Sequence, residues 1–209
     1  MSCLLVAACA SGSGQESAPI AVDELVTCIE RVHVEADRSR MAISDSFERL
    51  NFLAAGKFGK EPASAAFARF VQSIDVAEQQ AKRFREVVDP MLAAAKPVFT
   101  QWQADLKAIG SDRLRQRSEL RYAVTKERYD AITAVAVPAR DQFDGYVKAL
   151  RDHASFLAHD LNQGSIQDIQ EEVKLVANTA RSLDQSLENC LTAARAYVEG
   201  SSMPAEPAR

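Results

Sequence analysis

Residues 166–197, IQDIQEEVKLVANTARSLDQSLENCLTAARAY, decide the fold class of this chain. Their apolar side chains recur at intervals that alternate between three and four residues without a break. This spacing is typical of a helix that buries one narrow stripe, here called a seam, against neighbouring helices. The members of this seam are Ile166, Ile169, Val173, Val176, Ala180, Leu183, Leu187, Cys190, Ala194 and Tyr197. The segment therefore predicts a long amphipathic helix.

Three more seams with the same spacing run from residue 22 to 53, from 67 to 102 and from 122 to 161. Gly110 with Ser111, and Gly164 with Ser165, mark two boundaries between them, because glycine ends helices and serine caps the next one. Strong helix formers fill the segments between these boundaries. The helices are predicted over residues 21–55, 63–109, 112–162 and 165–199. We predict an all-α fold.

The predicted lengths indicate the shape of the molecule. At about 1.5 Å per residue, the first and fourth helices are about 50 Å long, and the second and third are about 70–75 Å long. Short turns make successive helices antiparallel neighbours. We therefore expect an elongated antiparallel four-helix bundle or coiled coil, with two long central helices and two shorter outer helices. The hairpin of the second and third helices should project beyond the end that carries both termini, and Pro90, Pro97 and Pro138 should bend it.

The composition and the motifs argue against several functional classes. Eight glycines with no GxGxxG or GxxxxGK pattern argue against a nucleotide-binding loop. A net charge of −4 with interspersed signs gives no reason to expect nucleic-acid binding. His33, His153 and His159 lack the spacing of metal ligands, and neither HExxH nor CxxC occurs. We therefore expect no catalytic residues, no metal and no cofactor.

The first residues, MSCLLVAACASGSGQES, have the pattern of a bacterial lipoprotein signal. Val6, Ala7 and Ala8 before Cys9 fit a lipobox, in which small side chains precede the cysteine that receives the lipid. The lipobox predicts lipidation at Cys9. Ala10 rather than aspartate follows the cysteine, so nothing argues for retention at an inner membrane, and we expect a place on the periplasmic side of the outer membrane. The alternative is an unprocessed N-terminus in a cytoplasmic protein. The expected parts are a truncated signal peptide (residues 1–8), a flexible tether (9–20), a helical bundle domain (21–199) and a disordered tail (200–209).

Cys28 and Cys190 lie on the first and fourth predicted helices, which are neighbours in an antiparallel bundle. The ends of the helices that carry them are adjacent, so the two cysteines should lie at similar heights. A disulfide between them is permitted in the periplasm and would close a loop of about 160 residues. The alternative is two ordinary buried thiols, because a disulfide needs Cα atoms within about 7 Å.

The turn between the second and third predicted helices is rich in cations. It carries Lys107, Arg113, Arg115, Arg117 and Arg121 against Asp105, Asp112 and Glu119. One interpretation is a solvated helix face. The other is contact with anionic headgroups or with another envelope protein, because this turn is expected to project at the end that carries the lipid.

Four stretches resemble an uncharacterised bacterial family, domain of unknown function family 2959. They are IERVHVEADRSR (29–40), FTQWQADLKAI (99–109), LRQRSELRYAVTKERYD (114–130) and FLAHDLNQGSI (156–166), and the resemblance covers about residues 25–199. Trp102 and the stretch from Phe156 to Asn162 are its most specific marks. The resemblance implies an α-helical, coiled-coil-like protein, often with a lipoprotein signal, and it brings no assigned activity and no catalytic residues.

These observations favour a lipid-anchored bacterial envelope protein with a structural or adaptor role and no catalysis. Its expected partners are the membrane, through the N-terminal lipid, and an unknown envelope protein. One alternative is a soluble coiled-coil module that associates with itself without lipid. A more distant alternative is a periplasmic carrier that holds an apolar ligand between bent helices.

Overall fold

The computed structural model describes residues 18–201, and this part of the chain is all-α. Its helices are α1 (Ala18–Ala55), α2 (Ala63–Ala108), α3 (Asp112–His159), α4 (Gln163–Asp168) and α5 (Gln170–Ser201). The predicted all-α fold with four long helices is therefore confirmed. Within residues 18–201, none of the helices combines the length and the apolar character that crossing a membrane requires. The expected signal peptide, Cys9 and most of the expected tether and tail lie outside the described residues. Where the prediction can be compared, α1 begins at Ala18 rather than at residue 21, and α5 ends at Ser201 rather than at residue 199.

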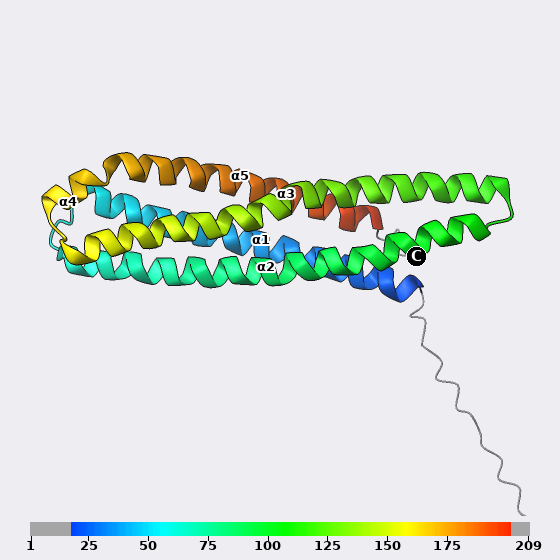
Figure 1. Ribbon diagram of the computed structural model, residues 1–209, viewed down its shortest axis with the longest axis horizontal. Coiled ribbons are helices and arrows are strands. Elements are labelled where there is room, and N and C mark those ends of the chain that lie inside the picture. The colour runs from blue at the N-terminus through cyan, green and yellow to red at the C-terminus, as the bar shows by residue number, and fades with distance from the viewer. Residues whose placement is uncertain (1–17, 202–209) are drawn as a thin grey trace, which may run out of the picture.

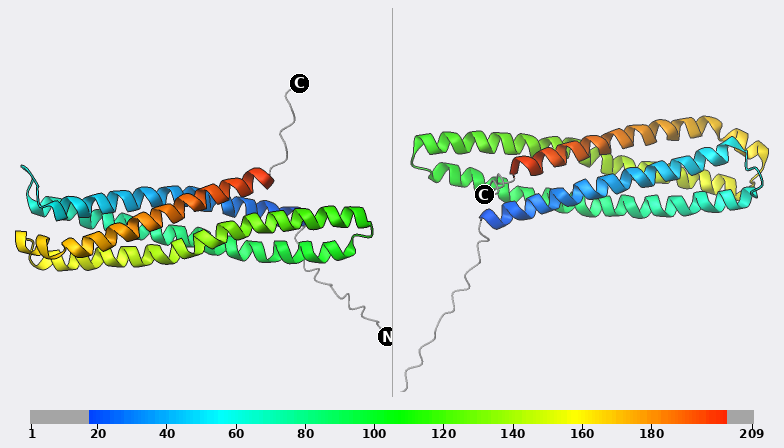
Figure 2. Two further views of the ribbon diagram at one scale, coloured as in Figure 1. Left: turned by 90° about the horizontal axis from the view of Figure 1, so that it is seen from above. Right: turned by 180° about the vertical axis from the view of Figure 1, so that it is seen from behind.

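The four long helices run antiparallel in sequence order and form an elongated bundle (Figures 1 and 2). Each packs against two others, so that α1–α2, α2–α3, α3–α5 and α5–α1 are the neighbouring pairs. The expected pair of long helices is present, because α2 and α3 have 46 and 48 residues against 38 in α1 and 32 in α5. The shorter helices also pack against each other, so the four surround one common core.

The seams of the sequence form that core. All ten members of the seam over residues 166–197 are buried, and so are most members of the other three seams. The exceptions at one end of the bundle are Val22, which is exposed, and Trp102, Tyr122 and Thr125, which are half-buried. The spacing thus identified the core residues but not the level at which the core ends.

The boundaries of the last helix differ from the prediction. Helix α3 ends at His159, and the side chain of Asn162 caps α4 by accepting a hydrogen bond from the Ser165 main-chain N–H at 3.0 Å. The predicted break at Gly164 is therefore wrong, because the Asn162 amide caps the helix and Gly164 lies inside it. Ile169 separates α4 from α5.

The prolines of the long helices do not end them. Helix α2 continues through Pro90 and Pro97, and α3 continues through Pro138. The bend that we expect at these positions stays a prediction.

Candidate interaction site at the projecting hairpin

Helices α2 and α3 extend past the start of α1 and the end of α5, and their turn forms one tip of the molecule (Figures 1 and 2). None of residues 100–128 is buried, whereas buried residues recur along both helices in the body of the bundle. We call residues 100–128 the projecting hairpin. From residue 100 to residue 109 the projection is about 15 Å long at the rise of an α-helix. The projection expected from the helix lengths is therefore present.

Aromatic contacts hold the two helices of the hairpin together at its base. The Trp102 and Tyr122 rings meet edge to face with centroids 5.7 Å apart, and Phe99 meets Tyr122 in the same way at 5.9 Å. The Trp102 indole N–H donates to the Ser118 hydroxyl at 3.1 Å. Such ring pairs contribute about 0.5–1.5 kcal/mol each, which is far less than a buried core.

The five cations predicted at the tip are brought together on this hairpin. Arg115 forms an ion pair with Asp112 and donates to the Ile109 carbonyl at 3.4 Å. The other four are exposed and form no ion pair within the described part of the chain. They are Lys107, Arg113, Arg117 and Arg121. Asp105 and Glu119, two of the three carboxylates near the tip, form no ion pair with these cations. The positive charge of the four side chains therefore faces solvent.

Not every arginine of the bundle body is paired, since Arg31, Arg83 and Arg195 form no ion pair within residues 18–201. The difference from the hairpin lies between α2 and α3, where three arginines of the body form ion pairs with carboxylates on the other helix. The pairs are Arg85–Asp144, Arg140–Asp89, Arg151–Asp75 and Arg151–Glu78. In residues 100–128, by contrast, no ion pair joins the two helices. This segment holds seven Lys or Arg and four Asp or Glu, a formal charge of +3 on a chain of −4, so the rest of the chain carries −7.

A surface groove of about 560 Å³ lies where the hairpin leaves the bundle. Its apolar lining includes Val22 of α1, Trp102 of α2, Leu120 and Val124 of α3, and the ring of Tyr197 on α5. Leu120 is 68% exposed and Val124 is 45% exposed, so both add exposed apolar surface to the groove. The sequence did not predict this groove, because Leu120 and Val124 lie off the predicted seam of α3.

The family model described as "Protein of unknown function (DUF2959)" matches residues 20–200. The chain belongs to this family. The match includes all the long helices and the projecting hairpin, so the resemblance seen in the sequence is confirmed for the bundle as a whole. No curated protein and no solved structure matched the chain. Because the description of DUF2959 assigns no activity, a function for this member has to be argued from its own residues.

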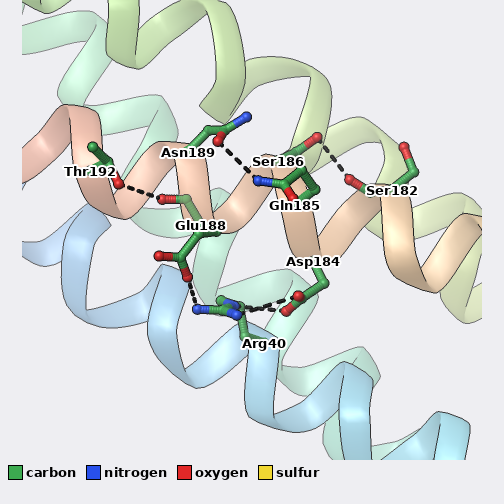
Figure 3. Close-up of polar contacts among 8 residues, drawn as sticks. All are labelled: Arg40, Ser182, Asp184, Gln185, Ser186, Glu188, Asn189 and Thr192. Atoms are coloured by element: carbon green, nitrogen blue, oxygen red, sulfur yellow. Dashed lines mark hydrogen bonds and ion pairs between the residues drawn. The ribbon is translucent and has the colours of Figure 1, made fainter.

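A charged contact between α1 and α5 is a second polar feature of this DUF2959 member (Figure 3). The Arg40 Nε donates to Asp184 at 2.7 Å, and the same guanidinium contacts Glu188 one turn further along α5. The hydrogen bond to Asp184 raises the pKa of Arg40 above its ordinary value. All three side chains are partly exposed, and such pairs contribute up to about 1 kcal/mol. We interpret this contact as structural.

Three contacts define how α1 and α5 are aligned. Arg40 pairs with Asp184, a His33 ring nitrogen lies 3.3 Å from the Leu191 carbonyl, and Gln170 donates to the Ala54 carbonyl at 2.6 Å. All three agree with one alignment, in which residue 28 lies opposite residue 196 and residue 34 lies opposite residue 190. The alignment is therefore constant along the whole contact.

This alignment separates the two cysteines for which a disulfide was one expectation. Cys28 lies six residues from the level of Cys190, which corresponds to about 9 Å along the helices and exceeds the Cα limit of about 7 Å. Both are buried free thiols in the structure. Burial raises the pKa of Cys190 to about 12. The expectation of similar heights was wrong, and the structure fits the alternative of two ordinary buried thiols.

The histidines do not converge on a site. The His153 Nδ1–H donates to the Ala149 carbonyl at 2.7 Å, while the buried Nε2 has no hydrogen-bond partner within residues 18–201. His33 lies on α1 and His159 at the end of α3. Among residues 18–201, no three His, Cys, Asp or Glu side chains lie close enough to hold a metal ion.

Proposed function

We propose that this chain is a lipid-anchored bacterial envelope protein on the periplasmic side of the outer membrane, with a structural or adaptor role. In this proposal the lipid is attached at Cys9, and the projecting hairpin is the element that contacts other envelope components. The observation that carries the proposal is the hairpin itself, which extends beyond the core with unpaired cations and exposed apolar side chains.

Stability of the bundle does not account for such a hairpin. The core ends with Phe99 on α2 and Tyr129 on α3, and none of the residues between them is buried, although Trp102 and Tyr122 are half-buried. Exposed apolar groups and unpaired arginines on an ordered helix contribute little to the free energy of unfolding. Departures from a stable local design are expected at functional sites. This supports an interaction role for the hairpin.

The position of the hairpin suits an anchor at Cys9. Helix α1 begins at Ala18 at the end of the bundle from which the hairpin projects (Figure 1). The nine residues from Cys9 to Ala18 span at most about 30 Å, and the hairpin projects about 15 Å. A lipid at Cys9 therefore leaves the hairpin tip within reach of the same membrane surface.

The anchor is tested by fractionating cells that produce the chain or its Cys9→Ser variant. We expect the unsubstituted chain in the membrane fraction with the mass of a diacylated Cys9, and the variant in the soluble fraction. An unmodified mass together with a soluble location of the unsubstituted chain would favour the self-associating module without lipid.

The interaction role is tested by placing a photo-cross-linking amino acid at Gln116 in the hairpin or at Gln72 in the body of α2. Both positions are exposed glutamines on the long helices, so they form a matched pair. We expect adducts with a lipid or a protein from position 116 and few from position 72. Equal yields from both positions would contradict an interaction role for the hairpin.

A further inference from the structure

We infer that the projecting hairpin binds the surface of an anionic lipid bilayer through one face of α3. This inference names the partner of the hairpin and rests on the interaction role proposed above. It is carried by the arrangement of basic and apolar residues on that face and by the place of the face in the fold.

The face is defined by spacing along α3. Arg113, Arg117, Leu120, Arg121 and Val124 fall at positions i, i+4, i+7, i+8 and i+11, which share one side of an α-helix. We call these five residues the basic stripe. All five are exposed, and none of the three arginines forms an ion pair in the described part of the chain. A helix surface that combines arginines with exposed apolar residues is typical of segments that lie at a membrane interface.

The basic stripe is the continuation of the surface that α5 covers further along α3. Leu120, Arg121 and Val124 share the groove at the base of the hairpin with Tyr197 and Gly200, which belong to the last turn of α5. Beyond Ser201, where α5 ends, nothing in the described residues covers this face. The basic stripe therefore lies on the side of α3 that α5 covers in the body of the bundle and leaves uncovered at the projecting end.

Charge favours a lipid surface over a second copy of the chain. Two copies that covered this face hairpin to hairpin would bring segments of +3 together and align their arginines. A bilayer with phosphate headgroups offers the opposite charge, and a guanidinium binds phosphate through two parallel hydrogen bonds. Each cation close to an anionic membrane strengthens binding by about fivefold. Leu120 and Val124 can then enter the boundary between headgroups and acyl chains.

The test measures binding of the full chain with Cys9→Ser to vesicles, so that the result does not depend on the lipid anchor. The vesicles are phosphatidylcholine alone or phosphatidylcholine with phosphatidylglycerol, and binding is measured by co-flotation. The test variant is R113E/R117E/R121E. The matched control is R31E/R83E/R195E, which reverses three exposed arginines of the bundle body that also form no ion pair in residues 18–201.

We expect binding to the vesicles that contain phosphatidylglycerol, little binding to phosphatidylcholine alone, and release at high salt. The stripe variant should bind at least about a hundredfold more weakly, and the control should lose far less. Helical circular dichroism should be unchanged in both, because the substituted side chains are exposed. Leu120→Ala should weaken binding by a smaller factor without changing its salt dependence.

Three results would overturn the inference. These are no preference for phosphatidylglycerol, equal losses in the two triple variants, and a stripe variant that binds like the parent chain. If sedimentation shows instead that the stripe variant dissociates a dimer, the face is an interface between two copies. In each of these cases, lipidation of Cys9 and cross-linking from position 116 would still support the proposed function.

Discussion

Leu150 and Leu120 lie on the same helix, and substitution to alanine should strongly destabilise the chain at Leu150 and have little effect at Leu120. Leu150 is 0% exposed in the core, where a Leu→Ala change removes buried carbon atoms and leaves a cavity, at a cost of about 2–5 kcal/mol. Leu120 is 68% exposed, so only about a third of its side chain leaves water on folding. Full burial of a leucine is worth about 1.5–3 kcal/mol, so the third that is buried contributes about 0.5–1 kcal/mol. Alanine offsets part of this lost free energy, because its helix propensity is higher than that of leucine. The expected change at Leu120 is therefore within about 0.5 kcal/mol.

The assay is urea unfolding followed by circular dichroism at equilibrium, with both variants and the parent chain. The midpoint of Leu150→Ala should move to clearly lower urea, while Leu120→Ala should retain the midpoint of the parent chain, and all three should have similar m-values. A loss above about 1.5 kcal/mol at Leu120 would show that the hairpin is part of the cooperative core, which contradicts a hairpin that projects beyond the core. A loss below about 1 kcal/mol at Leu150 would contradict the packing of the bundle itself.

Four further outcomes follow from single residues. Tyr146→Phe should cost about 1–2 kcal/mol in urea unfolding, because the Tyr146 hydroxyl is buried 2.9 Å from the Ser46 hydroxyl. Burial raises the pKa of Tyr146 to about 12. The stability that the protonated Tyr146 hydroxyl contributes is therefore complete below about pH 10 and is lost as the pH rises through 12. Unfolding curves of Tyr146→Phe at alkaline pH should show less of this loss. N-ethylmaleimide should leave the fully buried thiol of Cys190 unmodified in the native chain and modify it in urea, and a mass that shows a disulfide would contradict this. Gly56→Ala should destabilise by about 1 kcal/mol because Gly56 has φ +63°, whereas Gly145→Ala, in open space inside α3, should be neutral or stabilising by thermal unfolding.

The sequence identified the core well because a heptad seam depends only on the period of one helix. Every member of the seam over residues 166–197 is buried, including Cys190 and Tyr197 at its far end. Where the core ends depends on a different quantity, namely which helices cover the seam at each level. Trp102 and Tyr122 lie on their seams but remain half-buried, because α1 and α5 do not reach beyond them. A weak signal existed, since the seam of α3 continues backward from Tyr122 into Ser118 and Arg115, which are polar.

The alignment between distant helices was harder to predict. Similar heights for Cys28 and Cys190 were inferred from helix lengths alone, and a shift of six residues removed them from bonding distance. That shift is defined by side-chain contacts such as Arg40 with Asp184, which involve residues far apart in the sequence. The predicted helix boundary at Gly164 was wrong for a local reason. Asn162 is as good a capping residue as Ser165 and lies closer to the end of α3, so the helix begins earlier.

The candidate site was predicted in part. The cations at the tip were visible as a cluster in the sequence, and the structure brings them onto one projecting element. Their lack of ion pairs was not predictable, because it depends on which carboxylates lie across the hairpin. The apolar members of the basic stripe, Leu120 and Val124, were missed because they lie off the seam, where a pattern search for core residues does not look.

Hydrogen–deuterium exchange of the full chain, alone and with phosphatidylglycerol vesicles, tests most directly whether the projecting hairpin is the interaction element. Peptides within residues 100–128 should exchange faster than those of the body in the free chain, since this segment contains no buried residue. With vesicles, peptides that cover residues 113–124 should become protected while the body of the bundle is unchanged. Protection confined to the body, or none at all with bound vesicles, would contradict the account.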